Sequence, residues 1–142
     1  MEDPPEIYVV EHGYVRVVVS ARTTDLGFGV TIEVFGRLPE NCWKEALRFD
    51  CFDRDPHWHQ FPATGGSVEE RLAASSCADA VTIAVGRLRS GLAVWMTDLG
   101  YPEGSREIAN VTFENVFDRI AQSADDLQRL AVAHTAPPPS SV

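Results

Sequence analysis

The sequence has almost no lysine, and its basic residues do not gather anywhere along the chain. Lys44 is the one lysine among twelve basic residues, which face twenty-one acidic residues and leave a net charge of -9. Proteins that neutralise nucleic-acid phosphates normally carry a basic patch and often have a pI above about 9. The pI of this chain is near 4.8. We therefore expect neither nucleic acid nor an anionic membrane surface as a direct ligand.

The sequence also lacks a long apolar run and a positively charged start. Its longest candidate for a membrane span, residues 78–99, is interrupted by Asp79, Arg87, Arg89 and Asp98, whereas a span needs about 20 mostly apolar residues. The first six residues are acidic and proline-rich, the opposite of the start of a secretory signal. We expect a cytoplasmic protein without a membrane-spanning segment.

Cysteine is scarce, and several catalytic motifs are missing. Cys42, Cys51 and Cys77 are odd in number and share no C-x-x-C spacing, which favours reduced thiols over a disulfide framework. The sequence contains neither the G-x-S-x-G motif of serine hydrolases nor a phosphate-binding G-x-x-x-x-G-K-[ST] loop. The sequence therefore carries no complete catalytic signature.

Length and composition predict one globular domain. The chain has 142 residues, of which 44% are hydrophobic, enough apolar material for one core and too short a chain for two ordinary domains. Prolines 137–139 and the small polar residues after them cannot continue a helix. We expect residues 1–134 to form the domain and residues 135–142 to be a disordered tail.

The first half of the chain has the two-residue period of half-buried strands. Val15, Val17 and Val19 alternate with polar residues, and residues 28–34 alternate in the same way. A third strand is predicted over residues 43–53, with Trp43, Leu47, Phe49 and Cys51 on one face and Lys44, Arg48 and Asp50 on the other. Residues 7–10 are a candidate fourth strand. Short connections indicate an antiparallel meander of three to four strands.

The second half has helical spacing. Ser67 and Glu70 match a capping box, which predicts a helix over residues 67–74. Asp79 is a candidate cap for the next helix, and Gly100 is a natural stop for it. A last helix is predicted over residues 113–134. Strands followed by helices predict an α+β fold in which the helices pack on one face of the sheet.

One segment contains residues that suit a metal ion. In an extended chain, His57 and His59 point to the same side, and Asp53 or Asp55 is a candidate third ligand. Asp50 and Cys51 are candidates for an outer carboxylate that fixes a histidine tautomer, or for a thiol ligand. Zn²⁺, Fe, Mn or Ni would suit such a set.

Two other interpretations of this segment remain open. The histidines could simply form hydrogen bonds to aspartates in a loop, because an H-x-H pair alone is a weak motif. Cys51 could be a nucleophile with His57 or His59 as its base. Its strand face is otherwise apolar, however, and burial there would raise the pKa of the thiol and lower its reactivity.

The run LRFDCFDRDPHWHQFP, followed by a long helix that ends in LGYPE, resembles a small uncharacterised prokaryotic domain family. That family has a strand ending in Phe-Asp-Cys-Phe, an aspartate-rich turn and a Pro-His-aromatic-His motif before a helix ending in Gly-Tyr. The resemblance covers residues 46–103. It implies that Asp50, Cys51, His57 and His59 belong to a recurring pattern, and it implies no activity.

Two classes of function fit these observations. The first is a small binding or accessory subunit that acts within a larger assembly, with a protein partner or a second copy of the chain. Its candidate interface anchors are Trp43, Trp58 and Phe61, since aromatic rings bury much area at low entropic cost. The alternative for these rings is that they close the protein's own core. The second class is a stand-alone metal-dependent enzyme that uses His57 and His59 as ligands.

Overall fold

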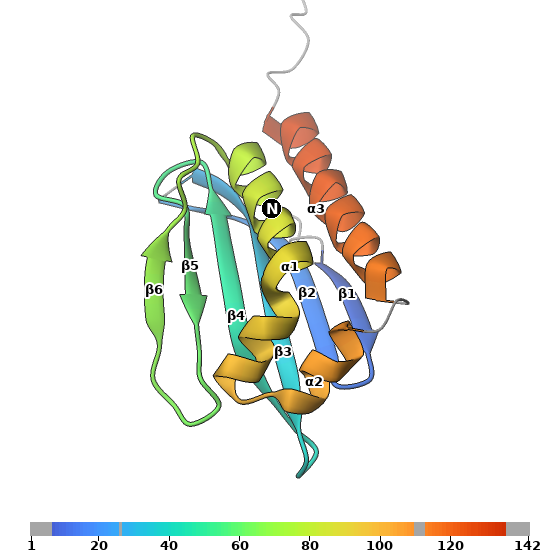
Figure 1. The fold of residues 1–142 in the computed structure, drawn as a ribbon. Helices are drawn as coiled ribbons and strands as arrows, with labels where there is room; N and C mark the ends of the chain where they lie inside the picture. Colours follow the sequence, from blue (N-terminus) through green and yellow to red (C-terminus); the bar gives the residue numbers. More distant parts are fainter. Residues whose placement is uncertain (1–6, 26, 110–112, 136–142) are drawn as a thin grey trace, which may run out of the picture.

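Six consecutive strands form one antiparallel sheet in the computed structural model, which describes residues 7–25, 27–109 and 113–135 (Figure 1). Each strand pairs with its neighbours in the sequence, in the order β1 to β6. The strands are β1 (Ile7–His12), β2 (Val15–Thr24), β3 (Gly27–Leu38), β4 (Cys42–Phe52), β5 (His57–Gln60) and β6 (Val68–Arg71). The α+β class and the antiparallel meander are confirmed, and the expected number of three to four strands is wrong.

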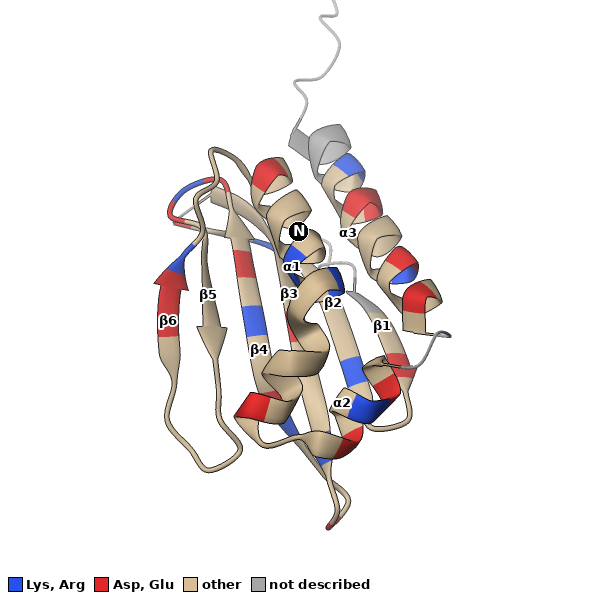
Figure 2. Cartoon of the chain, in the orientation of Figure 1, with Lys and Arg blue, Asp and Glu red and all other residues tan. Residues whose placement is uncertain are grey.

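Three helices cover one face of this sheet (Figure 1). No helix of the described residues lies on the other face, which we call the bare face. The three helices are α1 (Cys77–Leu99), α2 (Pro102–Ile108) and α3 (Glu114–Thr135). Gly100 ends α1 as predicted: it has a φ of 97°, and its N–H donates to the carbonyls of Met96 and Thr97. Figure 2 shows acidic and basic residues interspersed over both layers. None of the helices described is long and apolar enough to cross a membrane.

The helix predicted over residues 67–74 is wrong. Ser67 lies just before β6 and Glu70 lies within it, where Val68 pairs with Gln60 and Glu70 pairs with Trp58. The eight residues 67–74 are too few for a stable isolated helix, so pairing with β5 decides the conformation of residues 68–71. The cap of α1 is Ser76 instead, whose Oγ accepts the N–H of Asp79 at 3.1 Å. Asp79 itself accepts the N–H of Ser75 at 3.0 Å.

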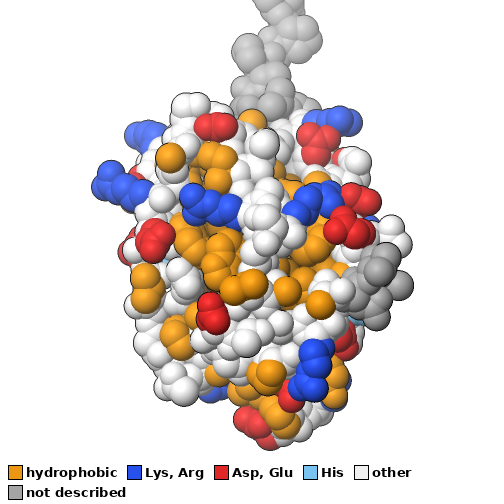
Figure 3. All heavy atoms as spheres, in the orientation of Figure 1, with side chains coloured by type: hydrophobic (Ala, Val, Ile, Leu, Met, Phe, Trp, Pro, Cys, Tyr) orange, Lys and Arg blue, Asp and Glu red, His pale blue; other side chains and the backbone are white. Residues whose placement is uncertain are grey.

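The core lies between the helices and the alternating residues of the central strands. Val19, Ile32 and Phe49 are in register across β2, β3 and β4, and all three are fully buried. On the outer side of the helices, apolar side chains lie among charged ones (Figure 3). A groove of about 420 Å³ between α1 and α3 has Val81, Val85 and Ala121 among its lining residues.

A β-bulge changes the face on which the start of β4 presents its side chains. Leu47 pairs with Val34 and Glu45 pairs with Phe35, so Ala46 is an extra residue on β4. Trp43 therefore lies on the bare face, where the guanidinium of Arg16 sits 4.4 Å from its ring. The prediction that Trp43 shares a face with Leu47 is wrong for this reason.

The C-terminal boundary is only partly described. Thr135, which we assigned to a disordered tail, is the last residue of α3. The rest of the expected tail, residues 136–142, lies outside the described residues.

Candidate metal site

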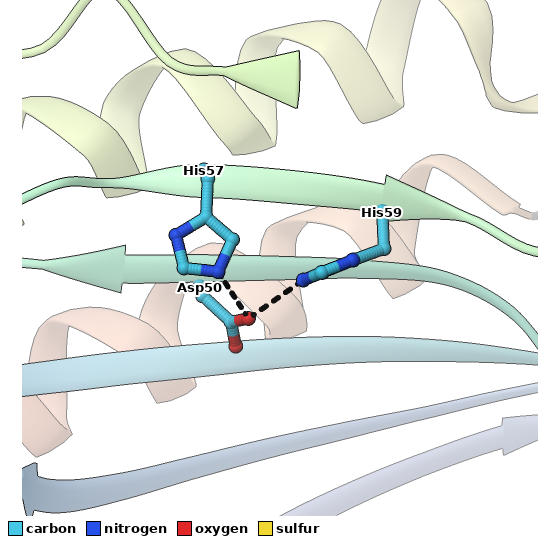
Figure 4. Close-up of side chains that lie close together, drawn as sticks. All are labelled: Asp50, His57 and His59. Carbon is cyan, nitrogen blue, oxygen red and sulfur yellow. Dashed lines mark ion pairs between the residues drawn. The ribbon is translucent and has the colours of Figure 1, made fainter. Parts of the chain in front are cut away.

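Three of the predicted site residues meet on the bare face of the sheet. Asp50 of β4 pairs with His57 of β5, and His59 lies two residues further along the same strand. The Oδ2 atom of Asp50 is 3.1 Å from Nε2 of His57 and 3.3 Å from Nε2 of His59 (Figure 4). One ligand atom from each residue lies within 4.8 Å of the other two. The three side chains can therefore contact one ion together.

Trp58 explains why both histidines point outward. Side chains alternate along a strand, so the residue between the two histidines faces the helices. There Trp58 is only 4% exposed and stacks on Phe49, with ring centroids 5.4 Å apart and planes 6° from parallel. It also packs on Trp95 of α1 at 5.1 Å. Burial of this large ring holds β5 in the register that presents His57 and His59 to the bare face.

The hydrogen bonds of His57 define its chemistry. Its Nδ1 is 2.8 Å from the backbone carbonyl of Asp55, and a carbonyl can only accept, so Nδ1 carries a proton. In neutral imidazole the other nitrogen then has a lone pair, which here faces the carboxylate of Asp50. Two acceptors face one another unless a proton or a metal ion lies between them. Proteins commonly orient metal-binding histidines through such a carbonyl contact.

The distances from the Asp50 oxygen to the two histidine nitrogens suit a transition metal. Bonds of about 2.0–2.1 Å in tetrahedral geometry place neighbouring ligand atoms roughly 3.3 Å apart. The two separations from the Asp50 oxygen are 3.1 and 3.3 Å. Two imidazoles and one carboxylate form a donor set that suits Zn²⁺ or Fe²⁺ and leaves coordination positions free.

Asp50 is buried and surrounded by donors from three strands. Its side chain is 4% exposed, and an ionised carboxylate at such a position needs compensating partners. Oδ1 accepts from the hydroxyl of Thr31 at 3.3 Å and from Nη2 of Arg22 at 3.5 Å. Nε of Arg48 lies 3.4 Å from Oδ2. These contacts fix the carboxylate beneath the two histidines.

A polar pocket adjoins the site at the edge of the sheet. Its volume is about 300 Å³, and its lining residues are Asp55, His57, Glu69, Glu70 and Arg71. Oε1 of Glu69 lies 3.6 Å from Nε2 of His57, on a side chain that is 60% exposed. Glu69 is therefore placed to supply a further oxygen to an ion bound by His57.

A second acidic pair occupies the same face, further from the histidines. The pKa of Glu45 is raised from 4.5 to about 8, mainly by burial and then by a hydrogen bond and charge repulsion from Glu33, while Arg48 opposes the shift. Nη1 of Arg48 lies 3.4 Å from Oε1 of Glu45. Arg48 thus connects this pair to Asp50.

Two predicted ligands do not join the cluster. Oδ1 of Asp53 accepts the backbone N–H of Cys77 at 3.2 Å, at the start of α1. The carboxylate of Asp55 pairs with Arg71 at 3.4 Å, and only its backbone carbonyl contacts His57. The structure therefore groups His57 and His59 with Asp50 and does not bring the carboxylate of Asp53 or Asp55 into that cluster.

Cys51 is also separate from the site. It lies next to Asp50 in β4, so its side chain points to the helix-covered face, where it is fully buried. Burial raises the pKa of its thiol far above the ordinary value, and the nearby Cys77 and Asp50 add to the effect. A buried thiol with a raised pKa is a poor nucleophile at neutral pH, and the strand places it on the opposite face from the two histidines.

The three aromatic candidates do not form one cluster. Trp58 is buried in the protein's own core, as described above, so its ring is not exposed to a partner. Phe61 stacks on His59 on the bare face, with ring centroids 5.7 Å apart, and Trp43 lies under Arg16. Trp43 and Phe61 therefore remain candidate interface residues.

Sequence reasoning did not identify Thr31, Arg22, Arg48 or Glu69 as members of the site. They come from four different strands and meet Asp50 or His57 only through the register of the sheet. The alternation in the sequence does place Thr31 and Arg22 on the face opposite the core valines. That alternation is the one sequence signal that points to them.

The fold and the site define a small α+β protein with a candidate His₂–carboxylate metal centre on the bare face of its sheet. The chain belongs to the family described as Domain of unknown function (DUF7700), whose model matches residues 9–124. The match extends beyond the 46–103 segment of the sequence resemblance to the N-terminal strands and part of α3. Searches of curated proteins and of solved structures find no match.

Proposed function

We propose that this protein binds one divalent transition metal ion, with Zn²⁺ as the reference, through Asp50, His57 and His59. The observation that carries the proposal is the orientation of His57, whose Nδ1–H is held by a carbonyl while its Nε2 faces a buried carboxylate. A bound cation would relieve the contact between the lone pair and the carboxylate. Both histidines and the aspartate would then act together as ligands of that one ion.

The position of the site supports exchange of a small ligand at the metal. Three protein ligands leave at least one coordination position free in a tetrahedral ion, as in catalytic zinc sites. The polar pocket beside His57 offers space for a water molecule or a small substrate at that position. These features favour the metal-dependent enzyme among the two classes of function, with a metal-bound water as the reactive group.

An accessory role within a larger assembly is the second proposal. It is supported by the bare sheet face, where Trp43 and Phe61 are only partly buried. The test is light scattering of the purified protein with and without Zn²⁺. An oligomer that Trp43→Ala weakens would support this role, and a monomer under both conditions that turns over a small molecule would overturn it.

The metal proposal is tested by calorimetric titration of metal-free protein with Zn²⁺. We expect one equivalent to bind, and we expect Asp50→Asn, His57→Gln and His59→Gln each to weaken binding by at least about tenfold. His12→Gln is the matched histidine control, because His12 pairs with Glu107 away from the site.

Asp55→Asn is the second control. It should leave the affinity unchanged, because residue 55 holds His57 through its backbone carbonyl. Absence of saturable binding would overturn the proposal. So would a Zn²⁺ affinity that the three ligand variants share with the parent protein.

A further inference from the structure

Two guanidinium groups flank the candidate metal site without making close contacts to it. Arg22 of β2 and Arg48 of β4 both approach Asp50, with N–O distances of 3.5 and 3.4 Å. Charge-assisted hydrogen bonds between a guanidinium and a carboxylate are normally about 2.7–2.9 Å long. Asp50 therefore holds both guanidinium groups near the site, but its contacts to them are too long to use their full hydrogen-bonding capacity.

Both arginines have more N–H donors than their contacts to Asp50 and Glu45 use. An arginine carries five N–H groups in a planar fork. Within the described part of the chain, Nε of Arg48 is buried and has no hydrogen-bond partner, and Nη1 reaches Glu45 at 3.4 Å. The side chain of Arg22 is 50% exposed. The Arg48 side chain is 31% exposed, so the exposed parts of both arginines can donate to an oxygen that arrives from outside.

Aromatic rings hold the two guanidinium groups in place. Arg22 lies over Phe52 at 5.6 Å from the ring centroid, and Arg48 lies over Phe61 at 5.5 Å. The rings also neighbour the histidines, since Phe61 stacks on His59 and Phe52 lies 6.5 Å from His57. Stacking limits the freedom of a guanidinium while leaving its N–H edge available. The donors are thus ordered before any ligand arrives.

The charge balance around a bound metal also favours an anion. A divalent ion and two arginines would bring four positive charges to a face that holds Asp50, Glu33, Glu45 and Glu69. The hydrogen bond between Glu45 and Glu33 needs a proton on one of the two carboxyl groups. With one of that pair neutral, these groups sum to +1, and Asp55, Glu70 and Arg71 of the adjoining pocket bring the sum to zero. The positive excess is thus local to the metal, Asp50 and the two arginines.

We infer that the metal-loaded site takes a small oxyanion, a carboxylate or a phosphate, which binds the metal through one oxygen and Arg48 and Arg22 through its other oxygens. This inference rests on the proposed metal site. Such an anion matches the planar fork of a guanidinium, and Arg22 and Arg48 are 50% and 31% exposed beside Asp50. It makes oxyanions the class of substrate or ligand that this site selects.

The test uses protein loaded with Co²⁺, whose visible absorption reports changes in coordination. Acetate and inorganic phosphate are titrated separately into the loaded protein. We expect a saturable change of the cobalt bands with at least one of them. Arg48→Gln and Arg22→Gln should each weaken that anion by about tenfold, in line with loss of a charge-assisted contact. The Co²⁺ affinity and anion-free spectrum of each variant are measured first, because both arginines also contact Asp50.

Arg129→Gln is the matched control. Arg129 pairs with Asp125 on α3, on the helix-covered side of the sheet, and is 74% exposed, so its loss should not weaken the anion. A response to phosphate alone or to acetate alone would support the inference and identify the oxyanion. Bound Co²⁺ that responds to neither would overturn the inference and leave the metal site standing. Equal affinities in the parent, Arg22→Gln and Arg48→Gln proteins would overturn the role of the arginines. Failure to bind Co²⁺ would overturn both proposals.

Discussion

The backbone carbonyl of Asp55 determines which ring nitrogen of His57 faces the carboxylate of Asp50. The carbonyl of Asp55 accepts from Nδ1 of His57 at 2.8 Å, so Nε2 is the atom that faces Oδ2 of Asp50, at 3.1 Å. Asp55 has a φ of 53°, in the left-handed region, and this turn brings its carbonyl under the ring. One tautomer is therefore selected by the backbone, and the lone pair it leaves on Nε2 points into the site.

Val17→Asp and Ile32→Asp should each unfold the domain. Both side chains are fully buried on the helix-covered face, and an unpaired buried charge costs several kcal/mol, against about 5–15 kcal/mol for a whole domain. Val18→Asp is the control, because Val18 is on the bare face and is only partly buried. The measurement is thermal melting by circular dichroism. Melting temperatures of Val17→Asp and Ile32→Asp that match the parent protein would contradict the register of β2 and β3.

Glu45→Gln should change how stability depends on pH. The raised pKa of about 8 means that the carboxyl is neutral in the folded protein at pH values where the unfolded chain has already ionised it. The parent protein therefore loses stability as pH rises from about 4.5 to about 8, and the variant does not. The difference in melting temperature, variant minus parent, should grow between pH 5 and pH 9. The exposed Glu40→Gln should show no such growth, and a constant difference for Glu45→Gln would contradict the raised pKa.

Gly29→Ala and Gly86→Ala should have opposite effects on stability. A Cβ at position 29 would lie 1.9 Å from the ring of Phe52, which must then leave its place beside Arg22 and His57. We expect a loss of about 1–3 kcal/mol. A Cβ at position 86 meets no atom within 4 Å, so alanine in this helix should add about 0.5–1 kcal/mol. Urea denaturation measures both, and an unchanged stability for Gly29→Ala would contradict the packing of Phe52.

Trp58→Ala should destabilise the fold, whereas Trp43→Ala should not. Trp58 is packed between Phe49 and Trp95 in the core, and removal of such a ring costs about 3–5 kcal/mol. Trp43 contacts Arg16 on the bare face and is partly exposed, so its loss should cost less than about 1 kcal/mol. Chemical denaturation of both variants makes the comparison. Equal losses would contradict the bulge that separates the two rings.

The long strands and helices were predictable because their hydrophobic periods are unambiguous. Alternating valines in β2 and the three-four spacing of α1 each fit only one kind of element. The short strands were not predictable from local sequence. Residues 67–70 satisfy a helix-capping motif, yet pairing with β5 makes them a strand. The face of Trp43 depends on one extra residue, Ala46, which no local pattern marks as a bulge.

The candidate site was predictable in part. The H-x-H spacing places His57 and His59 on one side of a strand, and Asp50 was among the candidate partners. Choosing Asp50 over Asp53 and Asp55 required knowledge of the register between β4 and β5, which pairs Asp50 with His57. The arginines and Thr31 come from strands that are distant in sequence, so only the assembled sheet brings them to Asp50.

The most direct test of the metal site is anomalous X-ray scattering from crystals grown with Zn²⁺. The account predicts one strong peak at the zinc absorption edge, about 2.0–2.2 Å from Oδ2 of Asp50, Nε2 of His57 and Nε2 of His59. Crystals of His57→Gln grown in the same way should lack it. A map of the parent protein without this peak, in which the histidines remain about 3 Å from the carboxylate as simple hydrogen-bond partners, would contradict the account.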